Sequence, residues 1–176
     1  MFRNICLIGL PSSGKTIIGK RLYKYLQMGF VDTDDMIRLK YKSDYHDEIK
    51  YREIEQDIIT SLHLKNTIIA TSSTVVYQPE SMHHLRYNLA SNIYHLYLPK
   101  DDFEERFQTP IDNLDEFYDE RIALYNKYAD KTISTHKSVI LNTFRDTLHQ
   151  PSYQDRYANR ISFPGVSLQS YPSPPL

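Results

Sequence analysis

The stretch "LIGLPSSGKTIIGKRL", residues 7–22, decides the fold that this chain is expected to adopt. An apolar run typical of a buried strand leads into a loop bracketed by Gly9 and Gly14, and Lys-Thr follows the second glycine. A helix is expected over residues 14–26, where four apolar residues recur at helical spacing: Ile17, Ile18, Leu22 and Leu26. Glycine, four residues and Gly-Lys-Thr between a strand and a helix form the pattern of a phosphate-binding loop, so this stretch predicts a nucleotide site.

The residue types of this loop suit the phosphates of ATP. Gly9 and Gly14 permit backbone angles that turn successive amides inward, and the next helix adds its positive N-terminal end. Lys15 is expected to reach the outer phosphates, and the Thr16 hydroxyl is expected to bind Mg²⁺. The predicted ATP contacts in the loop are Gly9, Pro11, Ser12, Ser13, Gly14, Lys15 and Thr16.

Two carboxylates end the second predicted strand, residues 29–35. Asp32 and Asp34 are two apart, so they share one face if the strand is fully extended. They also lie at its carboxyl end, where open parallel sheets bind ligands. One carboxylate near Mg²⁺ and one near an acceptor hydroxyl is the arrangement that phosphoryl transfer needs. The alternative is that "TDD" is a helix-capping turn.

Strands and helices alternate along the rest of the chain. Strands are expected at 2–8, 29–35, 66–71, 92–98 and 131–134. Helices are expected at 14–26, at 44–64 with Ser43 or Asp44 as cap, from Pro79, at 101–107, at 114–128 and at about 138–149. This alternation implies right-handed crossovers, and therefore an α/β fold: a three-layer sandwich with a five-stranded parallel sheet and a phosphate loop at its edge.

Composition limits the class of partner. The formal net charge is −1, so no overall field draws the chain to nucleic acid or to an anionic membrane. No apolar run approaches the ~18 residues of a membrane span. The single cysteine, Cys6, lies in an apolar strand, which suits a reducing compartment. We therefore expect a cytoplasmic protein, monomeric by default, with a small-molecule substrate.

A change of composition after Gln150 divides the chain into a domain at 1–150 and a tail at 151–176. The tail holds five of the nine prolines and neither Lys nor Glu, so no regular structure is expected there. Its apolar residues outnumber its charges, and we expect residues 151–168 to lie largely along the domain.

With the phosphate loop, "DTD" and "YREIE" in this order, the chain resembles the shikimate kinases, small kinases related in fold to the nucleoside monophosphate kinases. The resemblance covers roughly residues 3–148. It implies that Asp32 serves Mg²⁺ and that Asp34 contacts substrate hydroxyls and can act as the base.

The same resemblance implies an anion site for the acceptor. The family's Phe-Arg-x-x-Glu corresponds to Tyr51, Arg52 and Glu55, and its late Arg-x-x-Leu-Tyr…Ala-Asp corresponds to "RIALYNKYAD", which begins at Arg121. In the family the two arginines bind the substrate carboxylate. Guanidinium forks suit such an anion.

The chain departs from the family pattern at two places. Ser72, Ser73 and Thr74 replace three glycines whose backbone approaches the substrate, so we expect these side chains to contact the acceptor unless the backbone withdraws. The lid region, residues 104–117, is short and has Arg106 as its only arginine, which we assign to ATP. Loss of a phosphate-binding lid arginine costs on the order of 10³-fold in rate.

The sequence therefore predicts a transferase that uses ATP and Mg²⁺ to phosphorylate a hydroxyl of a small carboxylated acceptor, with Lys15 and Asp34 as catalytic residues. Shikimate is the default acceptor, and slow turnover is expected from both departures. Two alternatives stay open. One is a sugar-acid kinase similar to gluconate kinases, and the other is a catalytically weak nucleotide-binding protein whose scaffold serves protein interaction.

Overall fold

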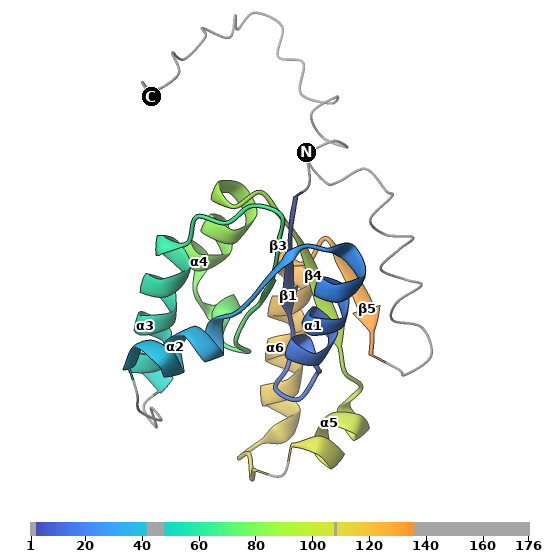
Figure 1. Cartoon of the computed structure of the whole chain (residues 1–176). Helices are drawn as coiled ribbons and strands as arrows, with labels where there is room; N and C mark the ends of the chain where they lie inside the picture. The colour runs from blue at the N-terminus through green and yellow to red at the C-terminus, as the bar shows by residue number, and fades with distance from the viewer. Residues whose placement is uncertain (1–2, 42–47, 108, 136–176) are drawn as a thin grey trace, which may run out of the picture.

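The computed structural model describes residues 3–41, 48–107 and 109–135 (Figure 1). A five-stranded, all-parallel sheet of order β2-β3-β1-β4-β5 forms its centre, which confirms the predicted α/β class. The strands are β1 (Asn4–Ile8), β2 (Gly29–Asp32), β3 (Thr67–Ala70), β4 (Ser91–Tyr97) and β5 (Lys131–Ser134). Every bound lies within three residues of the prediction, and the bounds of β5 match it.

Helices connect the strands. They are α1 (Lys15–Leu26), α2 (Thr33–Tyr41), α3 (Glu48–Ser61), the short η1 (Val75–Tyr77), α4 (Pro79–His83), η2 (His84–Asn88), α5 (Lys100–Arg106) and α6 (Leu114–Tyr128). Pro79 occupies the first position of α4, as predicted, because its fixed φ and missing N–H suit a helix start. No described helix is long and apolar enough to cross a membrane.

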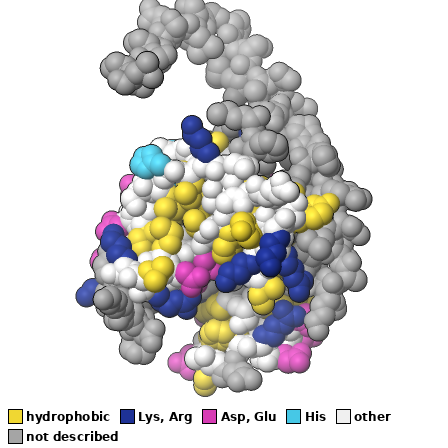
Figure 2. Space-filling model, viewed as in Figure 1, with side chains coloured by type: hydrophobic (Ala, Val, Ile, Leu, Met, Phe, Trp, Pro, Cys, Tyr) yellow, Lys and Arg dark blue, Asp and Glu magenta, His cyan; other side chains and the backbone are white. Residues whose placement is uncertain are grey.

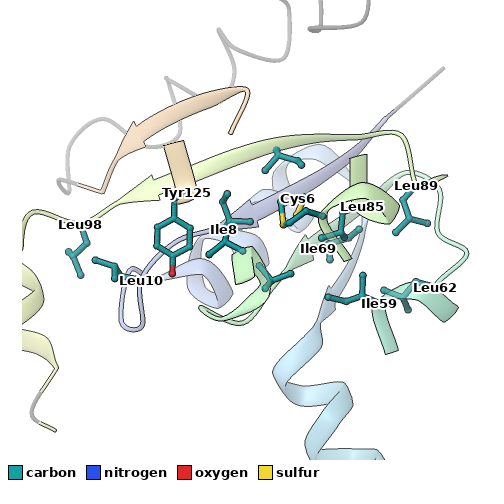
Figure 3. Close-up of a cluster of buried hydrophobic side chains, with 14 of the residues drawn as sticks. Cys6, Ile8, Leu10, Ile59, Leu62, Ile69, Leu85, Leu89, Leu98 and Tyr125 are labelled. Atoms are coloured by element: carbon teal, nitrogen blue, oxygen red, sulfur yellow. The ribbon is translucent and has the colours of Figure 1, made fainter. Parts of the chain in front are cut away.

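The two faces of the sheet bury different cores because successive side chains of a strand alternate. Ile5 and Leu7 of β1 pack with Ile18 and Leu22 of α1 on one face. On the other face, β1 contributes to a larger cluster that helices α3, α4 and α6 cover (Figure 3). Its labelled members include Cys6, Ile8, Leu10, Ile59, Leu62, Ile69, Leu85, Leu89, Leu98 and Tyr125. The sheet is thus the middle layer of three, and the buried position of Cys6 is confirmed.

Three local predictions are wrong. The second strand ends at Asp32, and residues 33–41 form a helix that the sequence reading left out. Helical spacing predicts Ile17 on the apolar face of the helix at 14–26 and Ile49 on that of the helix at 44–64, yet they are 61% and 71% exposed. Each stands next to the apolar stripe of its helix, where the spacing of isolated isoleucines does not distinguish buried from flanking positions.

Several other predictions lie outside the described residues. These are the caps at Ser43 or Asp44, the helix at about 138–149, the domain boundary at 150 and the packing of residues 151–168.

The register of the sheet gathers three loops at one edge. Asp32 of β2 pairs with Ala70 of β3, and Ala70 pairs with Leu7 of β1. The chain segments that follow these strands therefore begin at the same level. Because the strands are parallel, this is the edge at which open α/β sheets bind ligands.

Candidate active site

The phosphate loop connects β1 to α1 and has the backbone that an anion cradle requires. Gly9, Ser12 and Gly14 have φ values of 152°, 60° and 86°. A Cβ at Gly9 would lie 2.7 Å from the carbonyl oxygen of Leu96, so glycine is needed there for space as well as for φ. The hydroxyl of Ser13 is buried and has no hydrogen-bond partner among the described residues. An unpaired buried donor at the mouth of a helix suits a phosphate oxygen.

Lys15 starts α1 and turns back over the loop. Its Nζ donates to the carbonyl oxygens of Gly9 at 2.9 Å and Leu10 at 2.8 Å. Burial lowers the pKa of Lys15 to about 8, and the nearby charge of Asp34 is the largest effect opposing that shift. The ammonium group therefore lies on the loop itself and within the field of the predicted acceptor-side carboxylate.

Asp32 contacts the phosphate-loop helix and α2 with different oxygens. Its Oδ2 accepts a 2.6 Å hydrogen bond from the Thr16 hydroxyl, and its Oδ1 accepts from the backbone N–H groups of Asp34 at 3.0 Å and Asp35 at 3.4 Å. Asp32 is thus the cap of α2, which explains why the chain leaves the extended conformation directly after it. The predicted shared strand face of Asp32 and Asp34 is wrong, because Asp34 belongs to the first turn of α2.

The two predicted anion-binding arginines meet at one aromatic ring. The guanidinium carbon of Arg52, on α3, lies 4.2 Å from the centroid of Tyr77, and that of Arg121, on α6, lies 5.4 Å from it. Arg121 also lies 4.2 Å from the centroid of Phe117. Aromatic faces hold guanidinium groups by cation–π attraction while leaving their N–H donors to other acceptors. Two cations 69 residues apart in sequence are therefore gathered on one surface.

Asp34 is joined to this arginine pair through α3. Its Oδ1 accepts a hydrogen bond from the hydroxyl of Tyr51, the residue that precedes Arg52. Asp34 thus contacts the helix that carries Arg52, and its charge acts on Lys15 of the phosphate loop. On the face shown in Figure 2, acidic and basic side chains lie next to one another.

Glu55 organises the segment after β3, although the sequence reading gave it no role. It is completely buried on α3 and accepts hydrogen bonds from Thr33 Oγ1 at 3.4 Å, Thr74 Oγ1 at 3.2 Å and Gln78 Nε2 at 2.9 Å. Burial raises the pKa of Glu55. One carboxylate thus ties α2, α3 and residues 72–78 together.

The hydrogen bonds around Glu55 give a structural role to some of the serine and threonine residues that replace the family's glycines. The hydroxyls of Ser72 and Thr74 lie 2.8 Å apart, and both residues are buried, so these two hydroxyls bond within the protein. That all three side chains contact the acceptor stays a prediction. Ser73 is different. Its Oγ accepts from Arg121 Nη1 at 3.2 Å, and its carbonyl oxygen accepts from the Tyr125 hydroxyl at 2.7 Å.

The lid arginine is not brought to the phosphate loop by any contact of the described residues. Arg106 ends α5 and lies 3.7 Å from the carboxylate of Asp102, one turn earlier on the same helix. Its assignment to ATP stays a prediction.

A cavity of about 540 Å³ opens beside the arginine pair. Arg52 and Tyr77 line it together with Glu53, Gln56, Asp57 and Gln78. Neither Lys15 nor Asp34 is among its lining residues, so we do not assign the reacting groups to it.

The arrangement fits a nucleotide and Mg²⁺ on its donor chemistry. Mg²⁺ is usually held by one or two protein carboxylates together with substrate phosphates and waters, and Thr16 with Asp32 offers such a half-site. Among residues 3–41, 48–107 and 109–135, no group of three or more His, Cys, Asp or Glu side chains could hold a metal by itself. The site therefore suits a metal that arrives with phosphate.

Comparisons with known proteins agree with this geometry. A family model for shikimate kinase matches residues 11–150. A shikimate kinase of Caldicellulosiruptor bescii is 34% identical over 113 residues, which cover 60% of this chain and 64% of that protein. The chain thus spans less than two thirds of that relative. A shikimate kinase of Bacillus cereus strain G9842 is 28% identical over 165 residues, or 84% of this chain and 99% of that protein.

Solved structures show the same fold. A shikimate kinase from Acinetobacter baumannii in complex with shikimate has a TM-score of 0.67 at 21% identity, covering 92% of this chain and 97% of that chain. A gluconokinase from Sinorhizobium meliloti has a TM-score of 0.55 at 13% identity, with 83% and 89% coverage. The family match extends over most of the chain, and its range includes the phosphate loop from Pro11 onward, Asp32, Asp34 and both arginines. The chain therefore belongs to the shikimate kinase family, a family of ATP-dependent small-molecule kinases.

Proposed function

We propose that this protein transfers the terminal phosphoryl group of ATP to a hydroxyl of a small carboxylated acceptor, with shikimate as the first candidate. The observation that carries the proposal is the place of Asp34. Its charge acts on Lys15 of the phosphate loop, and its carboxylate is held by the residue next to Arg52. A base between a phosphate-binding lysine and an anion-binding arginine pair is the arrangement that acceptor phosphorylation needs.

The nucleotide side of the site consists of the phosphate loop, Lys15 and the Thr16–Asp32 pair. Lys15 would release the carbonyl oxygens of Gly9 and Leu10 and bind the outer phosphates of ATP. Thr16 and Asp32 would hold Mg²⁺, whose charge neutralises the phosphate oxygens. Catalysis then depends on positioning and on fixed positive charge more than on covalent chemistry.

On the acceptor side, Arg52 and Arg121 would hold the carboxylate of the acceptor, and Asp34 would accept the proton of the attacking hydroxyl. The new bond joins the acceptor oxygen to the γ-phosphorus, while the bond from that phosphorus to the bridging oxygen of ADP breaks. The proton moves to a carboxylate oxygen of Asp34. The rings of Tyr77 and Phe117 hold the guanidinium groups in fixed orientations, which reduces the entropy lost on binding.

Shikimate is favoured over a sugar acid because of the Glu55 network. The hydroxyls of Ser72 and Thr74 bond to each other, and Thr74 bonds to Glu55, so neither has to be displaced by a ring-shaped acceptor. The A. baumannii neighbour binds shikimate on a fold with a higher TM-score than the gluconokinase has. A sugar-acid kinase is the second candidate, since Ser73 remains beside Arg121 and offers a hydroxyl to a polyol.

The test is acceptor-dependent release of ADP, measured with shikimate, gluconate and nucleoside monophosphates at saturating Mg-ATP. We expect shikimate to be turned over. Asp34→Asn should lower kcat by about 10²- to 10⁴-fold, the usual range for loss of a general base. Asp35→Asn is the matched control, because Asp35 is the adjacent carboxylate but pairs with Arg38, and it should stay within about twofold of wild type. Absence of release with every acceptor, or equal losses in the two variants, would contradict the proposal.

A further inference from the structure

The hydroxyl of Tyr51 donates a hydrogen bond to Oδ1 of Asp34, from α3 to the first turn of α2. Both residues are partly buried. Within the described part of the chain, Tyr51 is the one residue whose side chain donates to the carboxylate of Asp34. This contact falls on the carboxylate to which the proposed function assigns the acceptor proton.

Tyr51 is a permanent donor. Burial, followed by the negative charge of Asp34, raises the pKa of the Tyr51 phenol above its ordinary value. The hydroxyl therefore keeps its proton wherever a kinase works, and its bond to an ionised carboxylate belongs to the strong, charge-assisted class. An acceptor hydroxyl would have to compete with this bond to reach Oδ1.

Asp34 is held at both of its ends. Its backbone N–H donates to Oδ1 of Asp32 at 3.0 Å, and its side chain is held by Tyr51. Tyr51 is in turn followed by Arg52, whose guanidinium lies on the ring of Tyr77. Adjacent residues of one helix thus orient the proposed base and supply part of the proposed anion site.

A free carboxylate has two oxygens, and each can accept a hydrogen bond from one of two neighbouring hydroxyls of an acceptor. The hydrogen bond from Tyr51 takes one of the two lone pairs of Oδ1 and sets the tyrosine beside that oxygen, which makes Oδ2 the more accessible acceptor for a substrate hydroxyl. The pattern of the family has phenylalanine at this position, a side chain without a hydroxyl.

Resting on the proposed function, we propose that Tyr51 is a specificity-determining positioning residue. It presents Oδ2 of Asp34 to the single hydroxyl that receives the phosphoryl group and removes the requirement for a second hydroxyl next to it. The acceptor range then includes small hydroxy acids that lack a vicinal diol at the reacting position.

The experiment compares shikimate with a deoxy analogue that lacks the hydroxyl adjacent to the reacting one, at saturating Mg-ATP. The enzymes are wild type, Tyr51→Phe and the control Tyr87→Phe, which removes the hydroxyl of a tyrosine that is 55% exposed. Wild type and Tyr87→Phe should have kcat/KM values for the two acceptors within about threefold of each other. Tyr51→Phe should prefer shikimate by about 10- to 100-fold, the value of a hydrogen bond to a charged group.

In Tyr51→Phe, the change in preference should appear mainly as a lower KM for shikimate. The kcat for both acceptors should fall, because the carboxylate of Asp34 is less firmly oriented. A merely structural role would move both acceptors equally. Equal preference in wild type and an active Tyr51→Phe enzyme overturns this inference and leaves the proposed function intact. A wild-type preference for shikimate above about tenfold also overturns it, without any variant. If wild type releases no ADP with any acceptor, both proposals fail together.

Discussion

The hydroxyl of Thr16 lies 2.6 Å from Oδ2 of Asp32, so the first turn of α1 and the end of β2 are joined at the point where a phosphate-bound cation would arrive. Thr16 lies in the helix that follows β1, and Asp32 ends β2. In the sheet, β3 lies between these two strands. A hydroxyl and a carboxylate in direct contact form a compact, oxygen-only site. Mg²⁺ prefers such ligands and retains water in its other positions.

Asp32→Asn should raise the Mg²⁺ concentration needed for half-maximal activity by about tenfold or more, because it removes the negative charge but keeps an oxygen and a helix cap. Activity is measured against Mg²⁺ at fixed ATP. Thr16→Ser is the control, since it keeps the hydroxyl, and it should follow wild type within about threefold. Identical Mg²⁺ curves for Asp32→Asn and wild type would remove Asp32 from the metal site.

The lowered pKa of Lys15 predicts a pH dependence of ATP binding. At pH 7 the amine is mostly charged, and it loses its proton as the pH rises through about 8. Bound phosphate favours the ammonium form and raises its pKa, so binding should take up a proton above pH 8 and affinity should fall from pH 7 to pH 9. Calorimetry in two buffers of different ionisation enthalpy measures this uptake.

Lys15→Arg is the control for that titration, because guanidinium stays protonated throughout this range. The variant should bind ATP more weakly, since the wide planar guanidinium does not fit the place that the compact ammonium group takes at the outer phosphates. Its proton uptake should be lost. Persistence of the same uptake in Lys15→Arg would assign the titration to another group.

Glu55 should be a main contributor to stability at the acceptor side. Glu55→Ala leaves three donors without their acceptor in a buried place and should lower the free energy of unfolding by about 2–4 kcal/mol. Glu55→Gln keeps one acceptor oxygen and should cost less. Urea denaturation of both variants gives the two values, and a loss below about 0.5 kcal/mol in Glu55→Ala would show that the network adds little.

Because the pKa of Glu55 is raised in the folded state, the contribution of Glu55 to stability changes with pH in a defined direction. The folded state holds the proton more tightly than the unfolded state, so the group's favourable contribution is present below the ordinary pKa and declines as the pH rises through the folded value. Relative to wild type, Glu55→Gln should therefore gain stability as the pH rises above about 4.5. A difference in the free energy of unfolding between Glu55→Gln and wild type that stays constant with pH would contradict this prediction.

Gly9→Ala should abolish ATP binding and destabilise the fold. The added Cβ would meet the backbone oxygen of Leu96 at 2.7 Å, and a φ of 152° is one that side chains of L-residues rarely adopt. Because the obstacle is backbone in β4, it cannot turn away. Gly19→Ala is the contrast, since the atoms nearest to its added Cβ belong to the side-chain ring of Phe30. Thermal denaturation and ATP titration should separate the two variants. Equal melting temperatures and equal ATP affinities of the two variants would mean that the phosphate loop adjusts to the added Cβ.

The sequence by itself determined the sheet and the phosphate loop, and it supplied the candidate site residues, whose roles stay predictions. The loop and the strands could be predicted because glycine-lysine patterns and apolar periodicity are local properties that fold in the same way in many contexts. The bounds of β5 were predicted to the residue for the same reason. Arg52 and Arg121 were named only through the resemblance of their surrounding motifs to the shikimate kinases. Where a local signal was present but overlooked, the prediction failed: acidic residues at 34–35 followed by Arg38 and Lys40 are typical of a short helix, and α2 lies there.

Glu55 also left a signal, because a carboxylate between Ile54 and Ile58 on the apolar side of a helix predicts a buried polar partner. What that partner is could not be deduced, since Thr74 and Gln78 lie 19 and 23 residues away and their side chains could have faced the acceptor instead. The tertiary structure alone decided which way Ser72 and Thr74 point, that Tyr77 lies between two arginines, and that Tyr51 holds Asp34. These are hydrogen bonds and ring contacts between elements, and their geometry depends on how whole helices pack, which no pattern of neighbouring residues encodes.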